Sequence, residues 1–374
     1  MQEPTPQPMN QNVSQRLVSL DAFRGITIGS MIIVNYPANW GQVYAPLLHK
    51  PWHGITPTDL IFPFFLFIVG VSIALAYNKQ LQKGLPLPGI YRKILSRGLK
   101  IFAVGIFLSL WPYFNFAELR VAGVLQRIAL VFVACAFLFV GTKWKTQAIV
   151  GATILIIYWL AMMFIPTPGY GQPMLEPGAN LAAWIDSYLL PGRLWQGTWD
   201  PEGLLSTLPA IATGITGMLV GKIILSPHSH EKKVIWMFLA GFFATIIGYV
   251  WSLHFPLNKP IWTSSYVMVT SGLASMTLAA CYYLIDMEKK TFGTKPWVIL
   301  GTNAIAVYVL AGLLSLIFYR LDYGGLRLSQ HAFQWLTGMG IVPKLASLMY
   351  PLFYLGILFI PATILYRKKI FIKL

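Results

Sequence analysis

Ten apolar stretches of about 20 residues recur along the chain, from Leu17 almost to its end. A helix needs about 20 apolar residues to cross the hydrocarbon core of a bilayer, so each stretch has the length of a membrane span. Of the 374 residues, 56% are hydrophobic and only 11% are charged, which is too little charge to cover a soluble protein of this size. The sequence therefore predicts an all-α, polytopic membrane protein with lipid as its main solvent.

The ten predicted spans are separated by short polar connections. Their approximate bounds are 18–38, 57–78, 93–113, 121–141, 147–165, 203–223, 233–253, 262–286, 297–319 and 346–366. Because no internal repeat is visible, we expect residues 16–374 to form a single transmembrane domain. The polar residues 1–15 have no basic n-region or cleavage site, so we expect a disordered cytoplasmic tail and no cleaved signal peptide.

The basic residues indicate how the chain is oriented. The 28 Lys and Arg residues outnumber the 12 Asp and Glu residues, and most lie in short strips between apolar runs. Such strips are typical of cytoplasmic loops, whereas a nucleic-acid-binding protein carries its cations on one surface. With the N-terminus in the cytoplasm, ten spans return the C-terminus to the same side. We expect no nucleic-acid partner and, since no organelle signal is evident, a bacterial inner membrane.

Three long segments fall on the predicted outer side, at 39–56, 166–202 and 320–345. They are rich in Trp, Tyr, Pro and Gly, and loops of this length usually carry function. Within the second segment, an amphipathic piece around Asn180–Leu190 can lie flat on the membrane. Such a segment can cap a central site.

The stretch best suited to proton-transfer chemistry is HKPWHGITPTDL, which contains His49, His53 and Asp59. A histidine accepts and returns protons near neutral pH, and a nearby carboxylate fixes its tautomer. An exposed loop histidine without chemistry is the alternative. A metal site at His49 and His53 is less favoured, because Pro51 breaks the helix that would align them, so we expect no metal. Asn35, at the end of the first span, can converge with His49 and Asp59 at the outer mouth.

Two further groups of polar residues are predicted within or beside the spans. Asp21 and Arg24, three residues apart in LDAFRG, form either a local ion pair or part of a ligand site. Gln126 and Arg127 lie about two turns inside the fourth span. A buried arginine requires an anion, which here is either Asp59 or a phosphate of a ligand.

Polar residues near the later spans have simpler alternative roles. Asp200 and Glu202 immediately precede the sixth span, where acidic residues often cap a helix. Asn303 lies in GTNAIAVY and is as well suited to packing between helices as to lining a pocket. We find no P-loop, nucleophile elbow, HExxH or dinucleotide-binding fingerprint.

Several sequence blocks occur together in one order, and the combination resembles a known family. The blocks are SLDAFRGITIGSMIIVNY, HKPWHGITPTDLIFPFFLFIVGVSI, RVAGVLQR, DPEGLLSTLPAIATGITGMLVGK, SYVMVTSGLAS and GTNAIAVYV. This chain is similar to the membrane-bound acyltransferases typified by heparan-α-glucosaminide N-acetyltransferase. The matching blocks span nearly all of the hydrophobic chain, which makes the resemblance more specific than any single motif.

The resemblance implies that an acetyl group moves from cytosolic acetyl-CoA to the amine of a glucosamine unit across the membrane. The family's active-site histidine precedes the tryptophan of the W-x-G turn by three residues, which here makes it His49, and the asparagine of its V-N-Y element corresponds to Asn35. His49 then acts either as a covalent acetyl carrier or as a general base. The lysosomal relative carries an additional lumenal region, so we expect a smaller acceptor here, such as an amino sugar or short glycan.

Roles follow for the candidate residues under this interpretation. The predicted catalytic residues are His49, Asn35 and Asp59. The donor acetyl-CoA is expected to contact Arg24, Arg92, Arg97, Gln126 and Arg127, and the acceptor to contact Trp52, Asp200, Glu202 and Asn303. The expected partners are acetyl-CoA, the acceptor and the bilayer, with a second copy of the chain as a further candidate. The main alternative is a transporter or flippase, in which the same polar residues line a substrate path.

Overall fold

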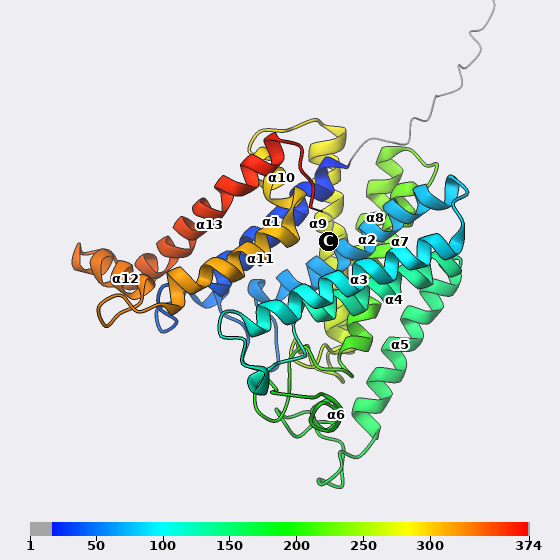
Figure 1. Ribbon diagram of the computed structural model, residues 1–374. Helices are drawn as coiled ribbons and strands as arrows, with labels where there is room; N and C mark the ends of the chain where they lie inside the picture. The colour runs from blue at the N-terminus through cyan, green and yellow to red at the C-terminus, as the bar shows by residue number, and fades with distance from the viewer. Residues whose placement is uncertain (1–16, 373–374) are drawn as a thin grey trace, which may run out of the picture.

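The computed structural model describes residues 17–372, so the predicted tail at 1–15 lies outside the described part of the chain. Across the described residues the regular structure is helical, and β-structure is limited to three isolated bridges. The predicted all-α fold is confirmed. Figure 1 shows the long helices running between two ends of the molecule, with α6 and the long irregular loops around it at the lower end of the view.

Eight helices among residues 17–372 are long and apolar enough to cross a membrane. They are α1 (Val18–Asn35), α2 (Ile61–Gln82, after the short turn η2 at Pro57–Leu60), α4 (Val124–Gly141), α5 (Trp144–Phe164), α7 (Thr207–Leu225), α8 (His230–Trp251), α9 (Ser264–Cys281, extended by a π-turn at Tyr282–Met287) and α13 (Pro343–Arg367). Each coincides with a predicted span.

The two remaining predicted spans have irregular features. The span predicted at 297–319 consists of α10 (Lys295–Thr302) and α11 (Ala304–Ser315, extended by a π-turn at Leu316–Arg320), which meet at an 80° bend. The span predicted at 93–113 falls within α3 (Leu87–Leu110), whose N-terminal half is rich in Lys and Arg. The structure therefore has eight clear spans and a bent ninth, and the count of ten and the cytoplasmic termini stay predictions.

The shorter helices lie in the connections between the spans. They are η1 (Ala45–Leu47), η3 (Phe116–Glu118), α6 (Leu181–Leu189) and α12 (Leu328–Gly338). Helix α6 coincides with the predicted amphipathic piece, and Asn180 caps it by accepting a hydrogen bond from the Ala183 amide at 2.9 Å. The buried face of α6 packs with Tyr158 and Met162 near the end of α5, so this segment is anchored to protein.

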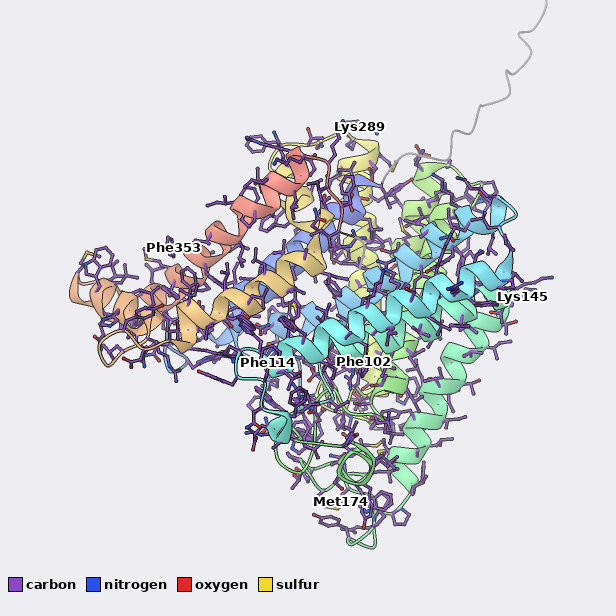
Figure 2. The ribbon with its side chains drawn as sticks, in the orientation of Figure 1. Phe102, Phe114, Lys145, Met174, Lys289 and Phe353 are labelled. Carbon is purple, nitrogen blue, oxygen red and sulfur yellow. The ribbon has the colours of Figure 1, made fainter. Side chains whose placement is uncertain are left out.

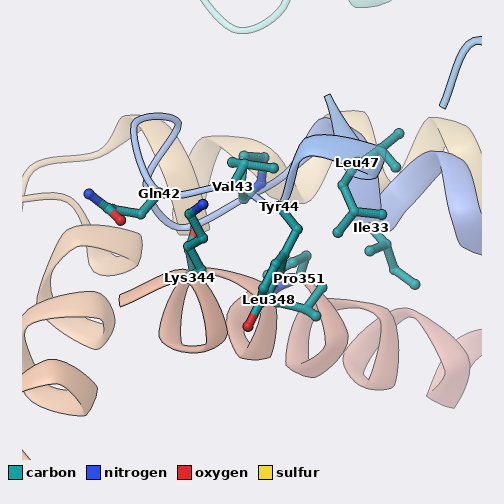
Figure 3. A pocket seen from close by; sticks show the side chains of 11 residues that line it. Ile33, Gln42, Val43, Tyr44, Leu47, Lys344, Leu348 and Pro351 are labelled. Carbon is teal, nitrogen blue, oxygen red and sulfur yellow. The ribbon is translucent and has the colours of Figure 1, made fainter. Parts of the chain in front are cut away.

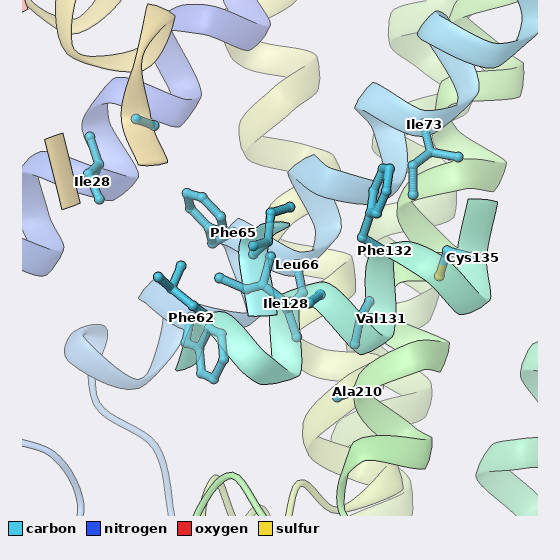
Figure 4. Close-up of a cluster of buried hydrophobic side chains, with 14 of the residues drawn as sticks. Ile28, Phe62, Phe65, Leu66, Ile73, Ile128, Val131, Phe132, Cys135 and Ala210 are labelled. Atoms are coloured by element: carbon cyan, nitrogen blue, oxygen red, sulfur yellow. The ribbon is translucent and has the colours of Figure 1, made fainter. Parts of the chain in front are cut away.

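The packed centre of the bundle consists of α1, α2, α4, α7 and α9. Figure 4 shows apolar side chains of this core, including Phe65 of α2, Ile128 of α4 and Ala210 of α7. By contrast, few residues of α5, α8 and α13 are buried: 28% of the most apolar stretch of α5 and of α13, and 17% of that of α8. In Figure 2 the side chains fill the spaces between the ribbons, while Phe353 and Lys145 lie near the perimeter. The outer helices therefore have the surface expected of a lipid-facing perimeter.

Glycines allow α2 and α7 to approach closely. A Cβ atom on Gly70 would lie 1.9 Å from the carbonyl oxygen of Gly214, and one on Gly217 would lie 2.0 Å from that of Phe67. Backbone carbonyls cannot move aside as side chains can, so these positions exclude any larger residue. Small residues at helix crossings are the usual means by which membrane helices pack, because lipid offers no hydrophobic driving force between them.

We predict that Gly70→Ala lowers the stability of the protein in detergent by about 1–3 kcal/mol, because the added methyl group forces α2 away from α7. The midpoint of thermal unfolding of the purified protein measures this effect. Gly356→Ala in α13 is the matched control, since a Cβ atom there meets no other atom within 4 Å. A Gly70→Ala variant as stable as Gly356→Ala would contradict the prediction.

Candidate active site

The carboxylate of Asp59 is fully buried at the start of α2, with 1% of its side chain exposed. One oxygen, Oδ2, accepts hydrogen bonds from the Lys50 amide, the Thr56 amide and the Thr56 hydroxyl, at 3.1, 3.0 and 2.9 Å. Thr56 and Asp59 thereby form a capping box on η2. The hydroxyl of Tyr266, on α9, donates to the Asp59 carbonyl oxygen at 2.5 Å. These bonds leave Oδ1 to face the preceding loop.

His49 approaches that oxygen. Its Nδ1 lies 2.7 Å from Asp59 Oδ1, and 44% of its side chain remains exposed. An ionised carboxylate can only accept a hydrogen bond, so Nδ1 carries the hydrogen and Nε2 of the neutral ring keeps its lone pair. This is the arrangement of a histidine whose tautomer is set by a carboxylate. The structure brings together two of the three predicted catalytic residues.

A lysine that the sequence analysis assigned no role completes this cluster. The Lys259 ammonium lies 2.9 Å from Nδ1 and 3.3 Å from Nε2 of His49, and 3.7 Å from Asp59 Oδ1. Lys259 belongs to the connection between α8 and α9. Its side chain is 20% exposed, and burial lowers its pKa below the ordinary lysine value, although the charge of Asp59 partly offsets that effect.

The turn that carries Lys259 is tied by side-chain hydrogen bonds. Asn258 is buried. Its side-chain Oδ1 accepts a hydrogen bond from the Ile261 amide at 3.0 Å, and its backbone amide donates one to the Thr263 hydroxyl at 3.1 Å. Its Nδ2 lies 3.3 Å from Nδ1 of His53, and the two residues also form a backbone bridge. His53 therefore joins the loop before α2 to the loop before α9. Burial lowers the pKa of His53 below its ordinary value.

The long segment 166–202 reaches the same region through Trp52. The indole Nε1 of Trp52 donates to the Leu175 carbonyl at 3.0 Å, and its ring meets Trp199 edge to face at 5.2 Å. Segment 166–202 is therefore in direct contact with the loop that carries the histidines. Asn35, the third predicted catalytic residue, is the last residue of α1 and is exposed; within residues 17–372 its side chain forms no hydrogen bond to His49.

Arg127 does not pair with Asp59 within the described chain, contrary to one of the two expectations for it. Its Nη2 donates to the Gly203 carbonyl at 3.0 Å and to the Ser206 hydroxyl at 2.5 Å, and its guanidinium lies over Trp262. Arg127 thus holds the start of α7. It is fully buried, and neither Nε nor Nη1 has a partner among the described residues. Gln126, beside it, is also buried.

Asp200 and Glu202 are both bound by Arg120. The guanidinium contacts Asp200 through Nε at 2.7 Å and Nη2 at 2.5 Å, and it also bonds Glu202. Burial alone would raise the pKa of Asp200, but the hydrogen bonds and charge of Arg120 hold it below its ordinary value. These two carboxylates thus fix the loop before α7 through Arg120. They do not cap α7, as the simpler interpretation had expected.

A separate cavity of about 160 Å³ opens near the other end of the bundle. Arg24 and Arg97 line it, with Ser72 and Tyr77 of α2 and Asn303 at the bend between α10 and α11. Arg24 also bonds Asp21 at 3.0 Å, the Gly301 carbonyl at 3.2 Å and Ser72 at 2.9 Å. Of the five residues predicted to contact the donor, these two arginines meet at one cavity, whereas Arg92, Gln126 and Arg127 do not line it.

Asn303 is held by the chain after α13. Its Nδ2 donates to the Ile370 carbonyl at 3.0 Å, and its Oδ1 accepts from the Ile372 amide at 2.9 Å. Ile372 also lines the cavity. Asn303 was predicted to contact the acceptor, yet it lies at the cavity near the start of α1, whereas His49 follows the end of α1.

A second hollow, shown in Figure 3, lies between the outer end of α1, the loop that follows it and the start of α13. Ile33, Tyr44 and Lys344 are among its lining residues. Its volume is only about 10 Å³, which holds no more than about one water molecule. It therefore offers no room for a substrate.

Comparison with known proteins supports the resemblance noted in the sequence. A family model described as the catalytic part of heparan-alpha-glucosaminide N-acetyltransferase matches residues 16–248. The chain belongs to this family. The matched region includes His49, Asp59 and Arg127 but ends before Lys259. The protein is therefore an integral membrane member of this family.

Two curated relatives carry the name heparan-alpha-glucosaminide N-acetyltransferase. The mouse protein (Mus musculus) is 28% identical over 356 residues, covering 79% of this chain and 53% of the relative. The human protein (Homo sapiens) is 29% identical over 352 residues, covering 79% of this chain and 52% of the relative. This chain thus spans about half the length of the curated relatives it matches.

The sequence analysis missed three residues of this region: Lys259, Arg120 and Asp186. Lys259 is separated from His49 by 210 residues, and only the tertiary fold brings them together. Asp186, on α6, is 2% exposed, and its Oδ1 accepts a hydrogen bond from the Leu204 amide at 2.8 Å. Burial raises the pKa of Asp186 to about 6, with the Leu204 bond and the charge of Arg127 acting in the opposite direction.

The raised pKa of Asp186 generates a pH-dependent prediction. The folded protein binds this proton more tightly than the unfolded chain, so the wild type loses stability as pH rises from about 4 through about 6. Asp186→Asn removes that loss and should be more stable than the wild type at about pH 7, by at most about 3 kcal/mol, with no advantage near pH 4.

Thermal unfolding midpoints in detergent across this pH range measure the difference. Asp322→Asn, at an exposed carboxylate of the outer segment, is the control and should follow the wild type. If the advantage of Asp186→Asn were constant with pH, the titration of Asp186 would not be its cause.

Proposed function

We propose that this protein transfers an acetyl group from acetyl-CoA to the amine of an amino sugar or short glycan on the opposite side of the membrane. The observation that carries the proposal is the His49–Asp59 pair, in which a buried carboxylate holds a half-exposed histidine at the outer end of the bundle. Family membership supports the reaction class, and the names of the curated relatives indicate a glucosamine-containing acceptor.

His49 supplies the central chemistry under this proposal. Asp59 holds the Nδ1 hydrogen, so Nε2 is the atom that reacts. Nε2 either attacks the thioester carbon and carries the acetyl group, or removes a proton from the acceptor amine as that amine attacks. Asn35 is proposed to donate a hydrogen bond to the thioester oxygen, from its position at the exposed end of α1.

Acetyl-CoA is proposed to enter through the cavity at the other end of the bundle. Arg24 and Arg97 supply positive charge there, which suits the phosphates of the nucleotide. From Arg24 to Asn35 the chain rises by about 17 Å along α1, at 1.5 Å per residue. The pantetheine arm, which is long, thin and only mildly polar, can cover such a distance between the helices and bring the thioester to His49.

The acceptor is proposed to bind on the exposed side of His49. Trp52 follows His49 by three residues, its indole nitrogen donates to the Leu175 carbonyl and its ring lies 6.0 Å from that of His53, and such aromatic rings commonly stack on sugars. Asp200 and Glu202 lie in the neighbouring loop and supply negative charge for an amino group, although Arg120 offsets part of it.

We predict that His49→Ala lowers the rate of CoA release by about 10²–10⁴-fold, because the reacting group is lost. The assay follows free CoA thiol with purified protein in liposomes, acetyl-CoA and glucosamine. Asp59→Asn should give a smaller loss, since the ring remains but its orientation is weakened. His331→Ala, at an outer histidine bonded only to the Tyr323 carbonyl among the described residues, is the control.

Two results would argue against acyl transfer. One is wild-type CoA release no faster than that of His49→Ala across a panel of amino sugars. The other is uptake of labelled glucosamine into the liposomes without any acetylated product, which would instead favour the transporter interpretation. Mass spectrometry of the His49 peptide after rapid mixing with acetyl-CoA separates a covalent acetyl carrier from a general base.

We predict that Arg97→Met raises the KM for acetyl-CoA by about 10-fold or more and changes kcat little, because a charge that contacts the nucleotide end is lost far from the reacting atoms. Lys100→Met removes an exposed cation from the same helix outside the cavity and serves as the control. A normal KM in Arg97→Met would exclude this cavity as the nucleotide site.

A further inference from the structure

Lys259 is the one charged group at His49 that the proposed mechanism leaves without a task. Its ammonium lies 2.9 Å from Nδ1 and 3.3 Å from Nε2 of the ring. The two nitrogens flank Cε1, so an atom in the ring plane at these distances from both would collide with carbon atoms of the ring. The ammonium therefore lies over the face of the imidazole. It is also not bonded to the Nδ1 lone pair, since Nδ1 donates to Asp59.

This position leaves the ammonium hydrogens next to the space in front of Nε2. The acyl group reacts either with Nε2 itself or with an amine that is hydrogen-bonded to Nε2. In both cases its carbonyl oxygen lies within a few ångströms of that nitrogen. A cation 3.3 Å from Nε2 and outside the ring plane is therefore directed at this oxygen rather than at the ring. Preorganised donors aimed at such an oxygen contribute more than any other single effect in many acyl transfers.

The surrounding structure keeps Lys259 in place. Its backbone follows the buried Asn258, whose side chain closes the turn, and the Gly54 amide donates to the Leu257 carbonyl at 2.7 Å. The charged and titratable groups that face the ammonium are Asp59 and His49, from the loop before α2, and Glu202, from the loop before α7. Asp59 lies 3.7 Å away, too far for a strong hydrogen bond, so the ammonium retains hydrogens for a ligand.

We propose that Lys259 binds the acyl oxygen during transfer and stabilises the negative charge that develops on it. When Nε2 or the acceptor amine forms a bond to the thioester carbon, the carbonyl electron pair moves onto this oxygen, and it returns when the C–S bond breaks and the CoA thiolate leaves. If His49 carries the acetyl group, the amine then attacks that group, and the pair moves and returns again as the bond from carbon to Nε2 breaks. On either route the amine proton passes to Nε2. Lys259 keeps its proton throughout and is not acylated. The proposal rests on the acyl-transfer function above and holds for either role of His49, because both routes pass through the same charged oxygen.

The test compares Lys259→Met with Lys259→Arg in the CoA-release assay, using the full chain in liposomes. We expect Lys259→Met to lower kcat by about 10²–10³-fold, the usual effect of losing one such donor, with the KM for acetyl-CoA within about threefold of the wild type. Lys344→Met, at an exposed lysine in the first turn of α13, should keep wild-type kinetics. Thermal midpoints and gel-filtration profiles establish that each variant is folded.

The pH profile gives a readout that a structural role would not move. Burial lowers the pKa of Lys259, so the wild type should lose activity on the alkaline side as the ammonium deprotonates. Arginine does not deprotonate in this range, so Lys259→Arg should retain part of the activity and show its alkaline decline at higher pH.

The outcomes separate this proposal from the proposed function. If the wild type shows no His49-dependent CoA release, acyl transfer and the role of Lys259 both fail. If the wild type is active but Lys259→Met keeps kcat within about threefold, only the role of Lys259 is overturned. It is likewise overturned if activity rises with alkaline pH and Lys259→Arg is as inactive as Lys259→Met, since the neutral amine would then be the working form.

Discussion

The end of the bundle that carries His49 depends on one interaction, the hydrogen bonding of the buried Asp59 carboxylate. A charged group at the start of a membrane helix is costly unless each oxygen is hydrogen-bonded, and Asp59 meets that requirement with bonds on both oxygens. Three of those bonds come from its own loop and so fold the chain between His49 and α2 into one conformation. The fourth bond, to His49, also sets which nitrogen of that ring carries the hydrogen and leaves Nε2 free to react.

Long-range contacts then build on this local unit. The Tyr266 hydroxyl anchors the Asp59 carbonyl to α9, and the turn before α9 delivers Lys259 to the same oxygen that holds His49. Trp52 ties the loop to the segment that also carries α6. The site is therefore assembled from the connections at one end of the bundle, whereas the helices beneath it, held together through contacts such as Gly70 with Gly214, supply a rigid base.

The sequence was sufficient to predict the features that are set by residues close together in the chain. Apolar length located the eight clear spans and the bent ninth, and the amphipathic pattern located α6. The ten-residue spacing of His49 and Asp59 suggested their contact, because one short loop joins them. Arg24 and Arg97, two of the five residues predicted to contact the donor, line one cavity, and the contact with the donor stays a prediction.

Other features depend on contacts between residues far apart in the chain and could not be predicted from the sequence. Lys259 and Arg120 looked like ordinary outer cations, since the partners of each lie 80 or more residues away. For Arg127 the sequence suggested either Asp59 or a ligand phosphate as the partner. Among the described residues its hydrogen bonds go instead to the Gly203 carbonyl and the Ser206 hydroxyl, and the phosphate stays a prediction. The bend at Asn303 was also hidden, because the residues on both sides form a continuous apolar run.

The bonds at Asn303 also constrain the order in which the protein is assembled. The bend between α10 and α11 leaves backbone groups without helical partners, and the side chain at the bend is bonded by residues 67 and 69 positions later in the chain. Those residues follow α13, so they reach Asn303 only after the last span has been inserted. During biosynthesis the cavity beside Asn303 therefore stays unfinished until residues 370–372 have been made, and its completion follows insertion of α13.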